Sequence, residues 1–181
     1  TPHGVPPFDK ILPEHFMPAF ERGMSLHEAE IDAITSNKDE ATFENTILAY
    51  DDAGQMLAQT ELVFGMLCAA ETNDRMQALQ EQAMPLLAAH RDKIRLDDKL
   101  FVRVKEVYDR RAALGLDAEQ MRLLQKTYDS FVRAGALLDA EQKARLKEIN
   151  GQLSLTAVKF GNNILAENNN FVLELKSDEL D

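Results

Sequence analysis

The sequence predicts an all-α fold of about six helices in an irregular multi-helix assembly, with a short strand-like segment at the C-terminus. Two observations lead to this prediction. Apolar residues recur three and four positions apart through most of the chain, which places them on one face of each helix. Residues that cap helix N-termini stand before several of these stretches, and glycines that commonly end helices follow two of them.

Three parts are expected along the chain. Residues 1–13 contain Pro2, Pro6, Pro7 and Pro13, and proline fixes φ and removes a donor, so this part is predicted to be an extended lead-in. Residues 14–168 are predicted to form the helical domain. Residues 169–181 include the strand-like segment FVLEL, which is too short to be stable alone and is interpreted as the start of a missing remainder.

The first helix is predicted over residues 14–36, with Pro18 causing a break or a late start. Its apolar face consists of Phe16, Phe20, Met24, His27, Ile31 and Ile34. The second is predicted to start after a cap at Thr42 and to run as one long helix to about Thr72. Its apolar side consists of Phe43, Ile47, Tyr50, Gly54, Leu57, Phe64 and Cys68.

Asn73 or Asp74 is predicted to cap the third helix, which should kink at Pro85. The fourth helix should start at Asp97 or Asp98 and end at Gly115.

The last two helices start with capping-box spacings, in which the cap and the residue three positions later satisfy each other's backbone. Asp117 with Gln120 begins the fifth helix, and Asp139 with Gln142 begins the sixth. The buried face of the sixth helix is predicted to consist of Leu146, Ile149, Leu153, Phe160 and Ile164.

Composition and charge exclude several classes of function. The chain carries a net charge of −11, and an acidic surface repels nucleic acid and anionic lipid, so neither is an expected partner. No apolar run approaches the ~20 residues of a membrane span. The single cysteine, Cys68, lies in an apolar run and is interpreted as a buried core thiol. One cysteine and no visible secretory signal together predict a cytoplasmic location.

The motif closest to a catalytic signature is His27-Glu28-Ala29-Glu30-Ile31. A zinc peptidase needs HExxH, because two histidines one turn apart bind the same metal, and Ile31 occupies the second histidine position. His27 is therefore interpreted as a partly buried structural histidine. No two of His3, His15, His27 and His90 stand three or four positions apart, so we predict no catalytic, cofactor-binding or metal-ligating residue.

Five segments resemble the N-terminal region of the thimet oligopeptidase family of zinc metallopeptidases, and of its bacterial peptidyl-dipeptidases in particular. They are PPFDKILPEHFMPAFERGM (6–24), TFENTI (42–47), DDKLFVRVKEVYDRRAALGLD (97–117), YDSFVRAGALLDAEQKARLKEIN (128–150) and KFGNNILAENN (159–169). The resemblance covers nearly the whole chain in order. No single segment is a catalytic signature, but their order and spacing together are specific.

The resemblance implies a longer, largely helical parent enzyme with two lobes around a deep channel. Zinc would lie on the catalytic lobe, bound by the two histidines of HExxH and a downstream glutamate, and the parent would remove dipeptides from the C-termini of short peptides. This chain has none of those positions, so the fragment alone is predicted to be inactive and to bind no zinc. Its implied role is a channel wall that limits substrate size, with the rest of the polypeptide as its partner.

Two alternatives remain open at this stage. The chain could be a stand-alone helical protein-interaction module without enzymatic activity. It could also be a small metalloprotein that uses dispersed histidine and glutamate side chains. Metal analysis separates the second alternative from the others, and the gene sequence beyond Asp181 separates the first from the peptidase.

Overall fold

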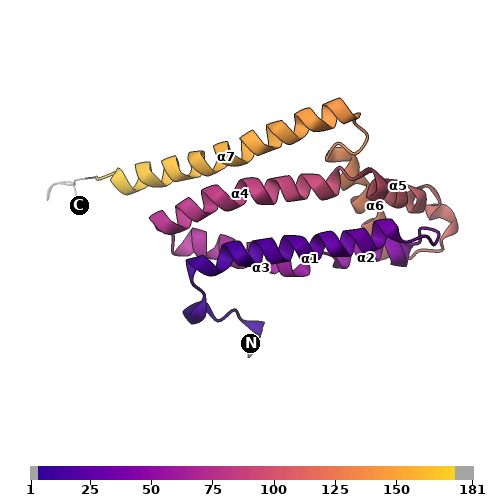
Figure 1. The fold of residues 1–181 in the computed structure, drawn as a ribbon, viewed down its shortest axis with the longest axis horizontal. Helices are drawn as coiled ribbons and strands as arrows, with labels where there is room; N and C mark the ends of the chain where they lie inside the picture. The colour runs from indigo at the N-terminus through magenta and orange to yellow at the C-terminus, as the bar shows by residue number, and fades with distance from the viewer. Residues whose placement is uncertain (1–3, 174–181) are drawn as a thin grey trace, which may run out of the picture.

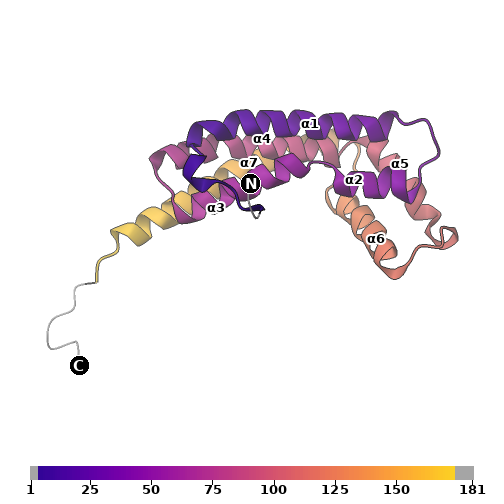
Figure 2. The ribbon, with the colours of Figure 1, turned by 90° about the horizontal axis from the view of Figure 1, so that it is seen from below.

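The computed structural model describes residues 4–173, and their regular structure is helical, which confirms the all-α prediction. The three longest helices lie side by side, with α4 between α1 and α7 (Figure 1). Helix α3 packs along α1, and the shorter helices gather at one end of the molecule (Figure 2). The helices are α1 (Phe16–Ser36), α2 (Ala49–Asp52), α3 (Gln55–Ala70), α4 (Asp74–Arg95), α5 (Asp98–Asp109), α6 (Ala118–Arg133) and α7 (Ala140–Asn170).

Helix α1 starts at Phe16, two residues after the predicted start, because a 3-10 turn at Pro13–His15 precedes it and not because of Pro18. The backbone N–H of Leu12 donates a hydrogen bond to Nδ1 of His15 (3.2 Å), which closes this turn. Pro18 lies in the first turn of α1, where backbone N–H groups have no partner inside the helix, so it causes no break. The lead-in before it contains another 3-10 turn, at Phe8–Lys10.

The single long helix predicted over residues 42–72 is wrong. Thr42 does cap this segment, but a π-helical turn (Phe43–Leu48) and α2 follow it, and the helix breaks before α3. The break lies at Gly54, whose φ of +77° is in the left-handed region that favours glycine. The apolar spacing continues across this residue, which is why periodicity alone did not reveal the break.

Replacing Gly54 by alanine is expected to lower the free energy of unfolding by about 2–4 kcal/mol, the sum of backbone strain and overpacking. An ideal Cβ at this position would lie 2.9 Å from Nδ1 of His27. Gly115→Ala is the matched control, because Gly115 has φ +63° and open space around it. Urea denaturation of the two variants measures the difference. Equal losses would show that His27 moves aside without cost.

Local capping signals determine where most helices begin. The capping boxes predicted for α6 and α7 are both present, with the N–H of Gln120 donating to Asp117 (2.9 Å) and that of Gln142 donating to Asp139 (2.8 Å). Asn73 caps α4 by accepting a hydrogen bond from the N–H of Met76 (3.1 Å). These caps satisfy donors that a helix leaves unpaired at its N-terminus.

Helix α4 includes Pro85 in its interior, as predicted, and the kink expected there stays a prediction. Another helix differs in detail from its prediction. The fourth predicted helix ends at Asp109 instead of Gly115, because a separate 3-10 turn at Arg111–Ala113 follows α5. Gly115 adopts a positive φ beyond that turn, so it ends the turn and not the helix.

Two buried clusters of apolar side chains form the core, and α1 and α4 contribute to both. The first lies at the end of the molecule where α5 and α6 pack, and the second lies between α1, α3 and α4. Central members of the first are Ile31, Ile47, Leu100, Val104, Leu124 and Phe131; those of the second are Phe16, Phe20, Leu57, Phe64 and Leu87.

The buried face predicted for the last helix is wrong. Leu153 and Phe160 are 63% and 65% exposed, and Ile149 and Ile164 are also exposed. Helix α7 packs on α4 through a different face, which includes the buried Val158. The periodicity identified a real apolar row, but no described residue covers it.

The strand-like segment lies partly outside the described residues. Residues 171–173 follow α7 without regular structure, and residues 174–181 are beyond the part that the structure describes. Within residues 4–173, no helix is long and apolar enough to cross a membrane.

Candidate functional site

Two histidines meet between α1 and α4. Nδ1 of His27 lies 3.0 Å from Nε2 of His90, so one imidazole donates a hydrogen bond and the other accepts it. The ring centres are 5.1 Å apart. His90 is only 5% exposed, and His27 is partly buried, as predicted.

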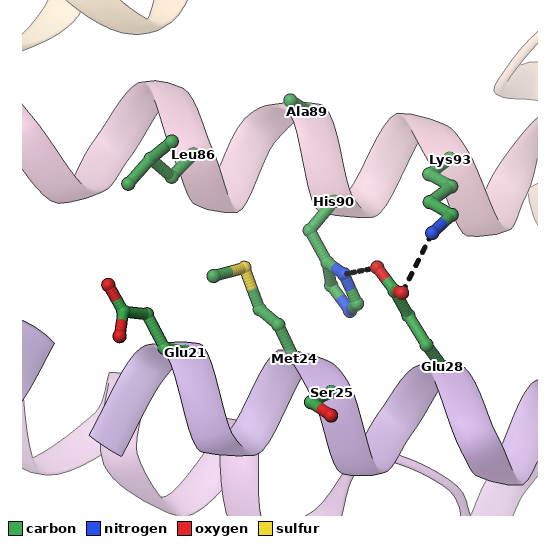
Figure 3. A pocket seen from close by; sticks show the side chains of 8 residues that line it. All are labelled: Glu21, Met24, Ser25, Glu28, Leu86, Ala89, His90 and Lys93. Carbon is green, nitrogen blue, oxygen red and sulfur yellow. Dashed lines mark ion pairs between the residues drawn. The ribbon is translucent and has the colours of Figure 1, made fainter. Parts of the chain in front are cut away.

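A charged group lies beside this pair on the surface of the same two helices. Glu28 accepts a hydrogen bond from Nζ of Lys93 (2.7 Å), and its other oxygen lies 3.5 Å from Nδ1 of His90 (Figure 3). That Nδ1 atom has no hydrogen-bond partner among the described residues. The three side chains line a shallow pocket of about 410 Å³, together with Met24 and Leu86.

Burial keeps both histidines neutral to lower pH than usual. The pKa of His90 is lowered by burial, against the opposing charge of Glu28. The pKa of His27 is lowered by burial and by the neighbouring His90, against Glu30 and Glu28. Two imidazoles in hydrogen-bond contact repel each other if both are positively charged. The contact is therefore most stable near neutral pH, where both rings are neutral.

Stability is therefore expected to fall as the pH decreases below about 6.5, the usual pKa of histidine. In that range the unfolded chain binds protons that the folded chain excludes, so the stabilisation is complete above the unfolded pKa and is lost as the pH falls through the folded pKa. Urea denaturation between pH 7.5 and pH 5 measures how the free energy of unfolding depends on pH. The fall should extend over about two pH units. The double variant His27→Gln/His90→Gln should have a shallower slope, and an identical slope would contradict the assignment.

The arrangement offers no metal site. Among residues 4–173, no three histidine, cysteine, aspartate or glutamate side chains stand close enough together to bind a metal ion. The resemblance implies zinc on the catalytic lobe of the parent, outside this chain, and that stays a prediction. Cys68 is half-buried in the second cluster, and burial raises the pKa of its thiol, which disfavours the thiolate a nucleophile needs.

Sequence reasoning found His27 and His90 separately but did not find their contact. They stand 63 positions apart, and a search for metal-ligand spacings of three or four residues cannot connect them. The available signal was that each lies on the apolar face of its helix. His15 takes part in the turn before α1, and His3 lies outside the described residues.

An apolar groove of about 740 Å³ lies between the lead-in, the start of α1 and α3. Met56, Leu62 and Met66 of α3 line it and are themselves exposed. Ile11 and Phe16 form its other wall. Its lining is mostly apolar, which suits the side chains of an extended peptide.

Known proteins match the chain over nearly its whole length. Dipeptidyl carboxypeptidase of Escherichia coli is 41% identical over 167 residues, which is 92% of this chain. The chain is related to the dipeptidyl carboxypeptidases. The corresponding protein of Salmonella typhimurium is 39% identical over 91% of the chain, and oligopeptidase A of Escherichia coli is 24% identical over a similar span. These comparisons confirm the resemblance, with higher identity to the dipeptidyl carboxypeptidases than to oligopeptidase A.

The chain spans about a quarter of the length of these relatives, 24% of the dipeptidyl carboxypeptidase of Escherichia coli. The match lies in the N-terminal part of each relative. No protein-family model matches the chain. The relatives are peptidases by name, and the matched quarter contributes helices but no metal-binding cluster in the part of the chain that the structure describes.

Proposed function

We propose that this chain is the N-terminal, non-catalytic helical domain of a zinc-dependent peptidase that removes dipeptides from the C-termini of short peptides. The observation that carries the proposal is the 41% identity to a dipeptidyl carboxypeptidase across 92% of the chain. The motif at residues 27–31 lacks the second histidine of HExxH, so the metal would be bound elsewhere in the polypeptide. The single cysteine suits a cytoplasmic enzyme.

The domain would form one wall of the substrate channel and limit which substrates enter. Its long helices pack side by side around two buried cores, which makes the wall rigid. The groove beside Leu62 and Met66 would contact apolar side chains of an extended peptide. A rigid wall excludes folded proteins because a channel that fits one extended chain is too narrow for them. Zinc, when bound to the rest of the enzyme, would supply an activated water.

The test uses the complete polypeptide encoded by the gene and measures dipeptide release from peptides of increasing length. Replacing Leu62 and Met66 together by alanine should raise KM by about thirtyfold and leave kcat nearly unchanged, because each lost apolar contact weakens binding by about 1 kcal/mol. Val102→Ala is the control, because Val102 is 53% exposed on α5 and lies away from the groove.

Each result has a clear meaning for the proposal. No dipeptide release by the complete polypeptide would contradict the assignment as a peptidase. Normal release with an unchanged KM would contradict the groove as part of the channel wall. Cleavage of folded proteins by the unmodified enzyme would contradict the role in limiting substrate size.

The exposed methionines favour one alternative, a stand-alone module that binds partner helices. Met56 and Met66 are 41% and 50% exposed on one side of the groove, and methionine-rich surfaces adapt to varied apolar partners. A gene that ends directly after the codon for Asp181 would favour this alternative over the peptidase.

A further inference from the structure

Helix α7 carries an apolar row that nothing in the described structure covers. Ile149, Leu153, Phe160 and Ile164 are 43%, 63%, 65% and 46% exposed. Their successive spacings of 4, 7 and 4 residues place them within about 60° of one another around the helix, so they form one continuous face. We call these four residues the outer face of α7.

The outer face lies away from the contact between α7 and α4. The contact with α4 involves the buried and half-buried positions on the opposite side of α7. Most of these residues are small or polar, and they are Gly151, Ser154, Val158, Asn162 and Leu165. Polar bonds also bridge the two helices, because Nδ2 of Asn150 donates to Asp92 (2.8 Å). The four side chains of the outer face therefore point away from α4. Helix α7 itself lies at the edge of the row of helices (Figure 1).

Charge is sparse in the middle of this face. Between Leu153 and Phe160 the same side of the helix carries Thr156 and Ala157, and the charged Arg145 and Glu167 lie on this side toward its two ends. The chain as a whole is 28% charged with a net charge of −11. Depletion of charged residues around large apolar side chains is typical of the centre of a protein interface.

Exposed apolar side chains continue toward the N-terminal end of the helix. A groove of about 400 Å³ there is lined by Leu138, Leu146 and Ile149, together with Glu141, Gln142 and Arg145. Leu137, next to Leu138 in the chain, is 62% exposed. These exposed apolar side chains extend along most of α7, and no side chain of residues 4–173 covers them.

We propose that the outer face of α7 is the surface on which the part of the same polypeptide C-terminal to this chain docks. The proposal rests on the proposed function, since the relatives are about four times as long as the matched segment. Two observations favour this occupant. The chain leaves α7 at Phe171, directly beyond the outer face, and Phe171 is itself 74% exposed. A segment that follows in the same polypeptide also docks at a high effective concentration.

Cysteine labelling in the complete polypeptide tests the proposal. Leu153→Cys and Phe160→Cys, made separately, should react with a maleimide at least about tenfold more slowly than Val102→Cys, because docking buries them. Val102 is the matched control, at 53% exposure on α5. Mass spectrometry of each labelled peptide separates these sites from any other cysteine, and circular dichroism checks that each variant keeps its helices.

Four results would overturn the proposal or separate it from the proposed function. Equal labelling of all three sites would overturn it. Protection that appears only with an added peptide would assign the face to substrate, and protection that is lost when the protein dissociates into monomers would assign it to a second copy. Dipeptide release measured on the same samples is independent: protection without release would contradict the peptidase and leave the docking surface standing.

Discussion

Phe20→Ala is expected to lower the free energy of unfolding by about 3–5 kcal/mol, the largest effect of any single substitution considered for this chain. Phe20 is 1% exposed, and its ring meets that of Phe64 edge to face, with 5.3 Å between ring centres. Phe16 completes a triangle of rings, 6.2 Å from Phe20 and 4.9 Å from Phe64. Removing one ring of the three opens a cavity between α1 and α3, and close packing around it prevents collapse.

Helices α1 and α3 cannot move closer together after a substitution, because they already pack tightly at Gly23. An ideal Cβ at Gly23 would lie 3.0 Å from the Cα of Leu57, so the two helices already touch through their backbones one turn away from Phe20. Helices held this closely cannot move together to fill a cavity.

Urea denaturation monitored by circular dichroism measures the loss, and Phe8→Ala is the control, because Phe8 is 39% exposed in the lead-in. The control should change stability by less than about 1 kcal/mol. If Phe20→Ala does not fold, Phe20→Leu should still fold with a loss of about 1–2 kcal/mol. A loss below 1 kcal/mol for the alanine variant would contradict the central place of this ring.

Local interactions explain the parts of the fold that the sequence predicted well. The caps at Asp117 and Asp139 act within four residues, so their spacing alone predicts the starts of α6 and α7. Apolar spacing also predicted the face of α1 that carries Phe20 and Ile31, because that face is buried inside this chain.

Backbone conformation and long-range contacts explain the parts that the sequence did not predict. Gly54 breaks a continuous apolar pattern through a backbone conformation that periodicity does not record. The meeting of His27 and His90 depends on how α1 and α4 pack, which no local motif specifies. For Phe160, the pattern gave the correct apolar row and the wrong degree of burial, because a pattern does not say which other segment covers a face.

A buried arginine was also missed, and it holds the loop between α1 and the π-helical turn. Arg103 of α5 is 9% exposed. Its Nη1 donates hydrogen bonds to the backbone carbonyls of Asn37 (3.0 Å) and Asp39 (3.1 Å), and its Nη2 donates to Oδ1 of Asn45 (3.1 Å). Its place in a helix of mixed charge gave no sign of burial.

Asn45 extends this network into the start of the next helical segment. Its side-chain oxygen accepts from the N–H of Thr42 (2.8 Å), and its Nδ2 donates to the carbonyl of Glu40 (2.9 Å). Arg103 and Asn45 together therefore satisfy backbone groups on both sides of the loop, and these groups have no helical or sheet partners.

Arg103→Met is expected to lower the free energy of unfolding by about 2–3 kcal/mol, because it leaves two loop carbonyls without a buried donor and removes one of the donors to the Asn45 side-chain oxygen. Arg110→Met is the matched control: Arg110 reaches Glu40 and the carbonyl of Ala41 in the same loop, but its side chain is 38% exposed, so its loss should cost about 1 kcal/mol or less. Amide hydrogen exchange is a second measurement that separates the network from apolar packing. Only loss of the network should raise the exchange rates of the N–H groups of Thr42 and Asn45. Equal stability losses in the two variants, with unchanged exchange at those amides, would show that α5 holds the loop by apolar packing and not by this arginine.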